Sequence, residues 1–592
     1  MTPQPKFANA SPARRPPSTT GSEREGSAGR KKLYHWYLLF ISGMGGLLYG
    51  IDVGIIAAAL LYLNQTVNLT VLQTSIIVAA VMGGSMLSSV VAGLLADWLG
   101  RKTMMIVSGL MFVVSVGLIV ISQSFLPLFG GRLLQGMSGG VIAVVVPLYL
   151  AECLSAKSRG AGTGIFQFML TVGIAIASVV GWAYTHGAQA AIAAAAGNAT
   201  LIAAAQNAAW RGMFLSVVYP GLIFLVGAFF LSESPRWLMR RGQRDKALAA
   251  IRRSCSEAEA ELELAEIDAP IDEASTSSSG VVGSLLQRKY VLPFLLACAI
   301  LGLNQTTGIN SILAFLVVIL KQAGLSPSMA TGGDVAVVVL NMVMTLVAVA
   351  LVDRKGRTFL LKIGTAGIII SLAAAALVFH GVEADRHDVR AQVQAAVSAG
   401  GLAIPLATSA LGEIPAGRSS VLTVYYDRGG GGDKVDTVLS TDPDPVLRIA
   451  PDPANTAALT IKRASFGPVS TESTGWLMMA LMCLFIASFA VGPGVVVWLA
   501  LSELMPTRIR STGMGIALLI NQGVSTVMAG VFLPVVGYYG YYAMFAFWAI
   551  CTVIYFLISA FILPETKGKT LEEIEQSFDR GSAAAAPRIG AP

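Results

Sequence analysis

A carboxylate and a guanidinium stand in stretches of the sequence that are otherwise apolar. Asp52 lies in LLYGIDVGII, residues 47–56, and Arg132 lies in an apolar segment that begins near residue 126. If these segments belong to a soluble protein, Asp52 lies in a core strand or in a loop between short helices. If they cross a membrane, each charge costs about 3 kcal/mol at the bilayer centre on insertion scales, which favours a functional role.

Uncharged polar side chains form a second group. Amides match the hydroxyls of a sugar because they donate and accept hydrogen bonds without charge, and an aromatic ring can cover its C–H face. For a single intramembrane Asn, a hydrogen bond between helices is the alternative. A distribution over five apolar segments favours a lined cavity, with these candidate substrate-binding residues: Gln167, Asn304, Gln305, Asn310, Asn341, Trp498, Asn521 and Gln522.

The composition of the chain decides between soluble protein and membrane protein. Hydrophobic residues make up 54% of the 592 residues and charged residues only 13%, about half the usual share of a soluble protein. The apolar residues form runs of about 20, the length that crosses a bilayer as a helix. We therefore predict an all-α polytopic membrane protein whose net charge of +7 concerns topology rather than nucleic acid.

Twelve apolar segments can be counted along the chain. They begin near residues 34, 71, 103, 126, 161, 211, 289, 331, 359, 474, 512 and 541. Alternate connections carry the Lys and Arg residues, as do both ends of the chain, so the positive-inside rule predicts that these connections and both termini are cytoplasmic. Asp52 and Arg132 then share a depth of ~10–14 Å below the outer surface, where they could pair.

Several segments lie outside the predicted spans. One of them, an insertion at residues 382–472, should form a small extracytoplasmic sheet, because short β-prone runs alternate there with Gly, Pro and Asp. Disorder is the alternative. Its turn-rich composition predicts that it lies outside the transport core. The predicted organisation is a disordered cytoplasmic tail at 1–33, an N-terminal six-helix bundle at 34–232, a cytoplasmic helical linker at 233–288, a C-terminal six-helix bundle at 289–563 interrupted by the insertion at 382–472, and a cytoplasmic tail at 564–592.

Three motifs occur twice, in the same order. GLLADWLGRK is repeated as ALVDRKGR, AECLSAKSRG as SELMPTRIRS, and SESPR as PETKG. Two homologous halves explain this order. Arg at a helix end can bind carbonyls and a carboxylate together, so we expect these residues to hold helix ends together in one gate state. The alternative is that these charges only set the orientation of the chain in the membrane. The candidates are Asp97, Arg101, Glu152, Arg159, Glu233 and Arg236 in the first half, and Asp353, Arg357, Glu503 and Arg510 in the second.

Taken together, these motifs resemble those of the sugar porters of the major facilitator superfamily, in their proton-coupled branch. The resemblance covers nearly everything from about 34 to 570 except the insertion, and rests on YGIDVG, GLLADWLGRK, GRLLQG, PLYLAE, SESPRW, NQTTGIN, VDRKGR, VGPGVVVW, SELMPTRIR and PETKG. It implies two six-helix bundles around a site that opens alternately to each side.

The resemblance also assigns roles to residues. It implies sugar contacts for Gln167, Gln305, Asn310, Asn341 and Trp498, and proton coupling at Asp52. The chain departs from the family pattern elsewhere: Asn304 replaces the first Gln of a pair, Ala314-Phe315 replaces a Tyr pair, and Gln522 replaces a residue that is often aromatic. A hexose, a pentose and a polyol therefore all remain open as substrates.

We expect proton-coupled symport of a sugar or polyol in the cell membrane, with Asp52 and Arg132 as the coupling pair. A passive facilitator, in which that pair is structural, and a transporter-like sugar sensor are the alternatives. No nucleophile–His arrangement, nucleotide loop or metal-ligand spacing is found, so we expect neither an enzyme nor a cofactor or metal. The expected partners are the sugar, protons and lipid; we expect no nucleic acid, a monomer, and no disulfide among the five cysteines.

Overall fold

The computed structural model describes most of the chain. The described residues are 21–154, 156–254, 260–262, 264, 288–398, 401–406, 411–412, 419–440, 445–451, 457–504 and 510–565. Within its helices, the side chains of residues 21–28, 156–163, 288–290, 353, 498–503 and 510–512 lie outside the described part.

Twelve helical spans in the described residues are long and apolar enough to cross a membrane, as predicted. The spans, three of them formed by two consecutive helices, come from α1 (Gly21–Thr66), α2 (Val71–Leu99), α3 (Arg101–Ile121), α4 (Phe125–Cys153), α5 (Ala156–Ala194), α6 with α7 (Ala199–Ser216, Val218–Phe230), α12 with α13 (Arg288–Thr306, Ile309–Gln322), α14 (Pro327–Lys355), α15 (Arg357–Ala384), α17 with α18 (Glu472–Val491, Pro493–Leu504), α19 (Arg510–Tyr539) and α20 (Tyr541–Phe561).

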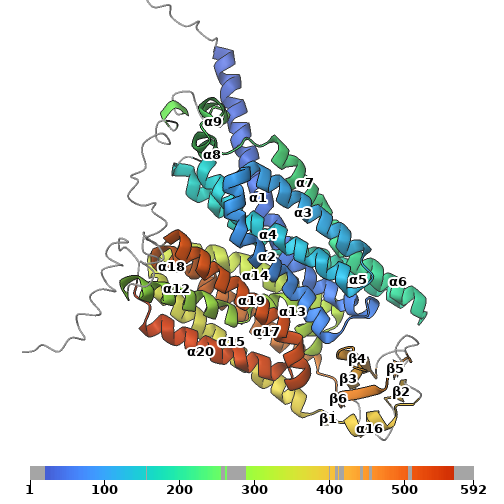
Figure 1. The fold of residues 1–592 in the computed structure, drawn as a ribbon. Helices are drawn as coiled ribbons and strands as arrows, with labels where there is room; N and C mark the ends of the chain where they lie inside the picture. The colour runs from blue at the N-terminus through green and yellow to red at the C-terminus, as the bar shows by residue number, and fades with distance from the viewer. Residues whose placement is uncertain are drawn as a thin grey trace, which may run out of the picture.

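The helices form two halves that lie side by side. Helices α1 to α7 make the N-terminal half, and α12 to α15 with α17 to α20 make the C-terminal half; the halves occupy the upper and lower parts of Figure 1. The halves meet where α2 packs on α19, α5 on α14 and α1 on α13. Large hydrophobic side chains such as Leu94, Phe230 and Leu377 are exposed on the outer faces of the helices. Such a surface suits lipid rather than water.

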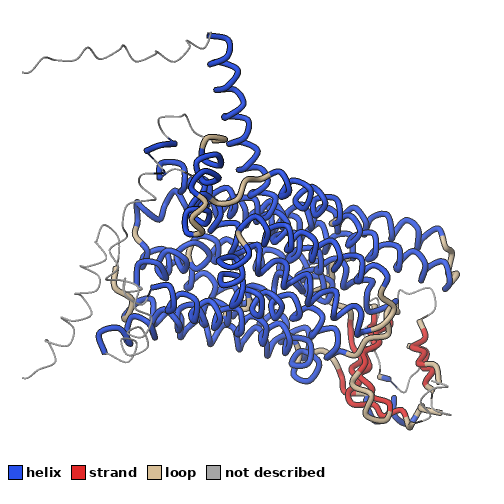
Figure 2. Tube along the Cα trace, turned by 45° about the horizontal axis from the view of Figure 1, so that its top comes forward, coloured by secondary structure: helices blue, strands red, loops and turns tan. Residues whose placement is uncertain are grey.

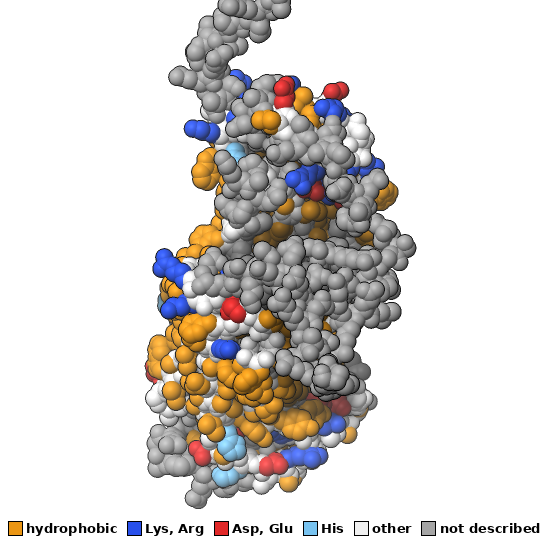
Figure 3. Space-filling model, turned by 90° about the vertical axis from the view of Figure 1, so that its left-hand side faces the viewer, with side chains coloured by type: hydrophobic (Ala, Val, Ile, Leu, Met, Phe, Trp, Pro, Cys, Tyr) orange, Lys and Arg blue, Asp and Glu red, His pale blue; other side chains and the backbone are white. Residues whose placement is uncertain are grey.

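The two ends of the bundle differ in character. The short helices α8 (Pro235–Arg240) and α9 (Arg244–Ile251) and the start of α3 lie at one end, which we name the basic-loop end. All the strands lie at the other end, which we name the sheet end (Figure 2). Figure 3 views the basic-loop end and shows Lys and Arg side chains near its top, with hydrophobic side chains covering the flank of the C-terminal half.

The insertion between α15 and α17 forms two small antiparallel sheets. One has the strand order β1-β6-β3-β4 and the other pairs β2 with β5. Side chains from both sheets, including Leu402, Leu422, Val424 and Ile461, are buried in a core of their own. The elements are β1 (His387–Asp388), α16 (Arg390–Ala395), β2 (Leu402–Pro405), β3 (Ser420–Arg428), β4 (Lys434–Leu439), β5 (Val446–Ile449) and β6 (Leu459–Pro468).

The structure differs from the sequence prediction at the start of the chain. Helix α1 begins at Gly21, so residues 21–33, predicted as part of a disordered tail, are helical. A helix that is already nucleated extends at little cost through polar residues, which explains the continuation. Residues 1–20, most of the linker after Ser254 and the tail after Glu565 lie outside the described residues, so the predictions for those segments stand untested.

Candidate functional site

Asp52 and Arg132 form an ion pair inside the N-terminal half. Arg132 Nη1 lies 3.2 Å from Asp52 Oδ1, and both side chains are buried. The same nitrogen donates to Gln135 Oε1 at 2.8 Å, and the guanidinium lies over the Phe214 ring at 5.6 Å. Asp52 Oδ2, Arg132 Nε and Gln135 Nε2 make no hydrogen bond in the described structure. The pair is therefore joined by a single contact and leaves polar atoms ready for new partners.

Close packing of α1 against α5 orients Asp52. Gly46 and Gly50 lie so near the backbone of α5 that any side chain there would collide with the Phe166 or Leu170 carbonyl. Glycines at this spacing allow two helices in a membrane to approach each other closely. Asp52 projects from another face of α1, toward α4 and Arg132.

A cluster of amides lies in the C-terminal half. Asn310 Nδ2 donates to Gln305 Oε1 at 2.9 Å and to Ser525 Oγ at 2.8 Å. Gln305 Nε2 donates to Asn521 Oδ1 at 3.2 Å, and Asn521 Nδ2 donates to the Leu301 carbonyl at 3.1 Å. The structure thus brings together three of the predicted amides, from α12, α13 and α19.

A break in the helix makes this cluster possible. Gly308 separates α12 from α13 and has φ +82°, a conformation that favours glycine. A Cβ atom at this position would overlap the Trp548 ring. The break lets Gln305 and Asn310 face each other although they lie five residues apart, which an uninterrupted helix would place on different faces.

A contact between the halves joins residues that lie close in sequence to the amides and to the ion pair. Gln522 Nε2 donates to the Tyr49 hydroxyl and to Ser85 Oγ, both at 3.4 Å. Tyr49 lies one turn before Asp52 on α1, and Gln522 follows Asn521 on α19. This contact therefore lies one turn from Asp52 on one helix and next to Asn521 on the other.

Other predicted substrate residues are not drawn into this cluster. Gln167 is exposed on α5, Asn341 is half-buried on α14, and Asn304 is buried with its Oδ1 unpartnered in the described structure. The side chain of Trp498 lies outside the described part. Phe315, which replaces a family tyrosine, stacks on Phe532 with centroids 4.5 Å apart and belongs to the packed core.

At the basic-loop end, Arg101 joins several helix ends within the N-terminal half. Its Nε and Nη2 donate to the two oxygens of Glu152 at 2.8 and 2.9 Å, and Nη2 also lies 2.7 Å from Asp97 Oδ1. Glu233 accepts the backbone N–H groups of Arg101 and Lys102. These carboxylates tie α2, α3, α4 and the segment before α8 together. Arg236 is exposed.

The C-terminal half repeats this arrangement in part. Glu565 accepts the backbone N–H groups of Arg357 and Thr358 at the start of α15, as Glu233 does at the start of α3. Gly356 and Gly100 have φ of +92° and +100° at the same step before these helices. The motif repeat is therefore also a repeat in structure. The side chains of Arg159, Asp353, Glu503 and Arg510 lie outside the described part.

Sequence reasoning missed three hydroxyl residues in these contacts and one buried carboxylate elsewhere in the spans. Tyr49, Ser85 and Ser525 complete the contacts above, but none of them gives a signal of its own in an apolar helix. A Ser hydroxyl can bond to its own backbone, and a Tyr ring is as typical of packing as of binding. Asp334 on α14 is a further buried carboxylate and lies beside Ser178 of α5, where the two halves meet. A charge in a predicted span was the signal that could have found it.

Comparisons with known proteins place the chain in a family. The family model "Sugar (and other) transporter" matches residues 38–408 and 455–578. The probable metabolite transport protein CsbC of Bacillus subtilis is 26% identical over 93% of this chain and 96% of its own length. The galactose-proton symporter of Escherichia coli is 24% identical over the same shares of the two chains.

Solved structures show the same fold. The inward-open xylose transporter XylE from Escherichia coli matches with a TM-score of 0.63 at 20% identity, covering 92% of this chain and 99% of that one. The matched proteins are membrane transporters rather than enzymes. The chain therefore belongs to the sugar transporter family, the sugar porters of the major facilitator superfamily.

Proposed function

We propose that this protein carries a sugar or polyol together with a proton across the cell membrane by alternating access. The basic-loop end, with both termini, faces the cytoplasm, because Lys and Arg in short connections favour that side. The sheet end then faces outward. The galactose-proton symporter among the relatives supports the coupling to protons.

The ion pair of Asp52 and Arg132 carries this proposal. The contact between Tyr49 and Gln522 supports it, because these residues lie close in sequence to Asp52 and to Asn521. A proton on Asp52 would remove the negative charge that holds Arg132, and Arg132 would then turn to its other partner, Gln135. Tyr49 lies on the same helix as Asp52, so the change would alter its contact with Gln522. Sugar binding and proton binding would then influence each other, as symport requires.

The halves are joined toward the sheet end in this structure. The Leu533 N–H donates to Ser75 Oγ at 3.3 Å, and the Val71 N–H donates to the carbonyl of Asp433 in the insertion at 2.8 Å. Gln522 contacts Tyr49 nearer the middle of the helices. For the site to open outward, these contacts must break. The Arg101 network lies within one half and would keep that half rigid while the halves rock against each other.

The amide cluster supports a neutral, hydroxyl-rich substrate. In the cluster each amide already exchanges hydrogen bonds with another, so sugar hydroxyls could replace these partners without leaving a charge unpaired. The same chemistry suits hexoses, pentoses and polyols.

The Asp52→Asn variant tests the proposal. Asn keeps the size of the side chain but cannot release a proton. Vesicles that contain this variant should therefore no longer accumulate sugar when a proton gradient is applied. Exchange of labelled for unlabelled sugar should continue, because exchange needs no release of the proton. The measurement is the ratio of exchange to accumulation in proteoliposomes.

Asp334→Asn is the matched control, since it neutralises another buried carboxylate within the spans. It should leave accumulation in place. Accumulation that persists in Asp52→Asn would show that the ion pair is structural, as in a passive facilitator.

A further inference from the structure

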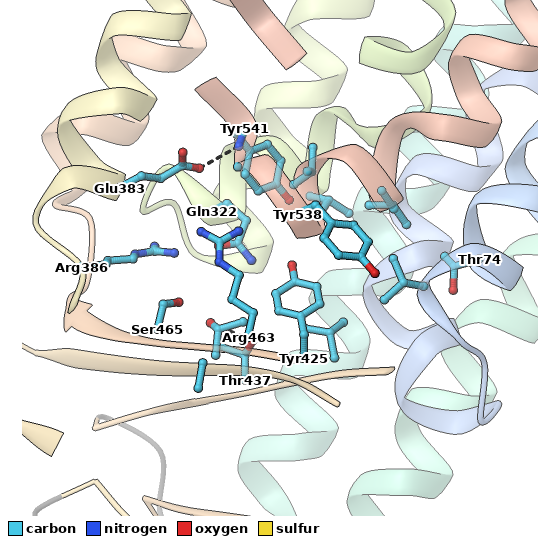
Figure 4. A pocket seen from close by; sticks show the side chains of 18 of the residues that line it. Thr74, Gln322, Glu383, Arg386, Tyr425, Thr437, Arg463, Ser465, Tyr538 and Tyr541 are labelled. Atoms are coloured by element: carbon cyan, nitrogen blue, oxygen red, sulfur yellow. Dashed lines mark hydrogen bonds between the residues drawn. The ribbon is translucent and has the colours of Figure 1, made fainter. Parts of the chain in front are cut away.

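A cavity lies at the sheet end, between the insertion and both halves of the bundle. Its volume is about 460 Å³, within the range of small-molecule sites. Asn64 and Thr74 of the N-terminal half, Gln322 and Tyr541 of the C-terminal half, and Tyr425 and Arg463 of the insertion are among the residues that line it. Figure 4 shows Thr74, Gln322, Tyr541, Tyr425 and Arg463 around the hollow.

The strands of the insertion present a polar face to this cavity. Val424 and Tyr426 of β3 point into the insertion's own core, so the alternating residues Thr423 and Tyr425 face the other way. Thr437 on the neighbouring strand β4 also lines the cavity. A sheet face that packed only against helices would carry apolar residues, whereas this face carries hydroxyls and Arg463.

Two charged side chains in the cavity are incompletely bonded. Glu383 Oε1 accepts the Tyr541 N–H at 2.7 Å, but Glu383 Oε2 and Arg386 Nε are buried and make no hydrogen bond in the described structure. Leaving such atoms unpaired costs free energy, so a ligand that supplies both a donor and an acceptor would gain from binding here. Burial also raises the pKa of the Tyr425 phenol, which therefore stays a neutral hydroxyl at physiological pH.

The mixture of charges indicates the class of ligand. Arg386 and Arg463 alone would attract an anion, but Glu383 and Asp388 line the same cavity and would repel it. Hydroxyl groups satisfy carboxylate and guanidinium together, and the rings of Tyr425, Tyr538 and Tyr541 can cover the C–H face of a sugar ring.

We propose that this cavity is a second sugar-binding site, which captures a neutral sugar or polyol at the outer end before it reaches the central amides. The inference rests on the proposed function, because it places the sheet end outside the cell. The family model omits residues 409–454, which include Tyr425 and Thr437, so much of this wall is an addition to the family fold.

Equilibrium binding to the full-length protein in detergent tests the capture site. The probes are labelled D-glucose, D-xylose and myo-inositol, and the background is the double variant Gln305→Ala, Asn310→Ala, which weakens the central site. We expect residual binding in this background, and we expect Arg386→Gln added to it to reduce that binding at least about tenfold. Tyr425→Ala is a second, uncharged test. Lys462→Gln is the control, because Lys462 is exposed beside Arg463 and does not line the cavity.

Uptake kinetics give a separate readout. With the central site intact, Arg386→Gln should raise the KM for sugar about fivefold or more and leave kcat unchanged, provided that thermal unfolding shows an intact fold.

The outcomes separate this inference from the proposed function. Sugar binding to the unmodified protein that disappears entirely in the double variant would overturn the capture site and leave the function standing. Absence of binding to the unmodified protein for all three probes would overturn both. Residual binding that prefers glucuronate to glucose would overturn the neutral class of ligand.

Discussion

At the scale of single residues, the amide cluster is a set of hydrogen bonds that a substrate can take over. Asn310 donates to both Gln305 and Ser525, and Gln305 in turn donates to Asn521. These bonds hold each amide in a fixed orientation before the substrate arrives. Such preorganisation reduces the conformational entropy that the side chains lose when a substrate binds.

Asn310→Ala should weaken sugar binding without unfolding the protein. The change removes an amide that orients Gln305 and that would contact the substrate under the proposed function, and a hydrogen bond of this kind is worth about 1–3 kcal/mol, or roughly 5- to 150-fold in Kd. Equilibrium binding measures the effect. Thr345→Val is the control, because the Thr345 hydroxyl bonds to a carbonyl of its own helix. Equal sugar affinities in the Asn310→Ala and Thr345→Val variants would show that Asn310 does not contribute to sugar binding.

Sequence alone predicted some of these contacts and not others. Asp52 and Arg132 could be paired because residue counts along two helices gave them one depth, and two opposite charges in apolar surroundings strongly favour contact. Gln167 and Asn341 could not be placed, since the rotation of a helix about its axis is set by packing rather than by residue counts. The contact of Tyr49 with Gln522 could not be predicted either, because it depends on how the two halves pack against each other.

At the scale of elements, the break between α12 and α13 sets the geometry of the site. Gly308 has φ +82° and lies against the Trp548 ring, so neither its backbone nor its surroundings admit a side chain. Trp548 fills the space beside the break and fixes the direction of α13.

Gly308→Ala should therefore lower both stability and sugar affinity. Positive φ costs an alanine about 1 kcal/mol or more, and the overlap with Trp548 adds to this penalty. Thermal unfolding and sugar binding of the purified variant measure the two effects. Gly302→Ala, on the same helix, is the matched control, because an added Cβ atom there would lie 3.6 Å from its nearest neighbour, in Ile520. Similar losses in both variants would show that the break has no special role.

The strands of the insertion show which elements a local sequence pattern can predict and which it cannot. Four strands, β3 to β6, lie on the short β-prone runs between turn residues from which the sheet was predicted. The two-residue strand β1 is polar and exposed, and it pairs with β6 only because both are held near α15 and α17. Its pairing depends on the tertiary structure, which no local pattern encodes.

At the scale of the whole molecule, the insertion touches both halves. Arg463 Nη1 donates to the Gly537 carbonyl of α19 at 2.8 Å, whereas the Val71 N–H of the other half donates to the Asp433 carbonyl. A rocking motion that opens the sheet end must separate Val71 from Asp433. The insertion, predicted to lie outside the transport core, thus bridges the interface that transport would open.

A disulfide across this contact should stop transport. In the double variant Val71→Cys, Asp433→Cys, oxidation should block sugar uptake into vesicles, because the outer ends of the halves could no longer part. A reductant should restore uptake. The single variants, treated with the same oxidant, control for effects on the native cysteines. Full uptake by the cross-linked protein would show that the halves do not separate at this end.

The way the insertion is anchored makes the protein suitable for observing single turnovers. Both chain ends of the insertion continue directly into helices of the C-terminal half, so its sheets should travel with that half as one body. The cysteines in the described part of the chain all lie in membrane-spanning helices. Once Cys255 is also replaced, the turn between β3 and β4 and the connection between α1 and α2 can be labelled selectively with two fluorophores. Energy transfer between such labels would then record each opening and closing in real time.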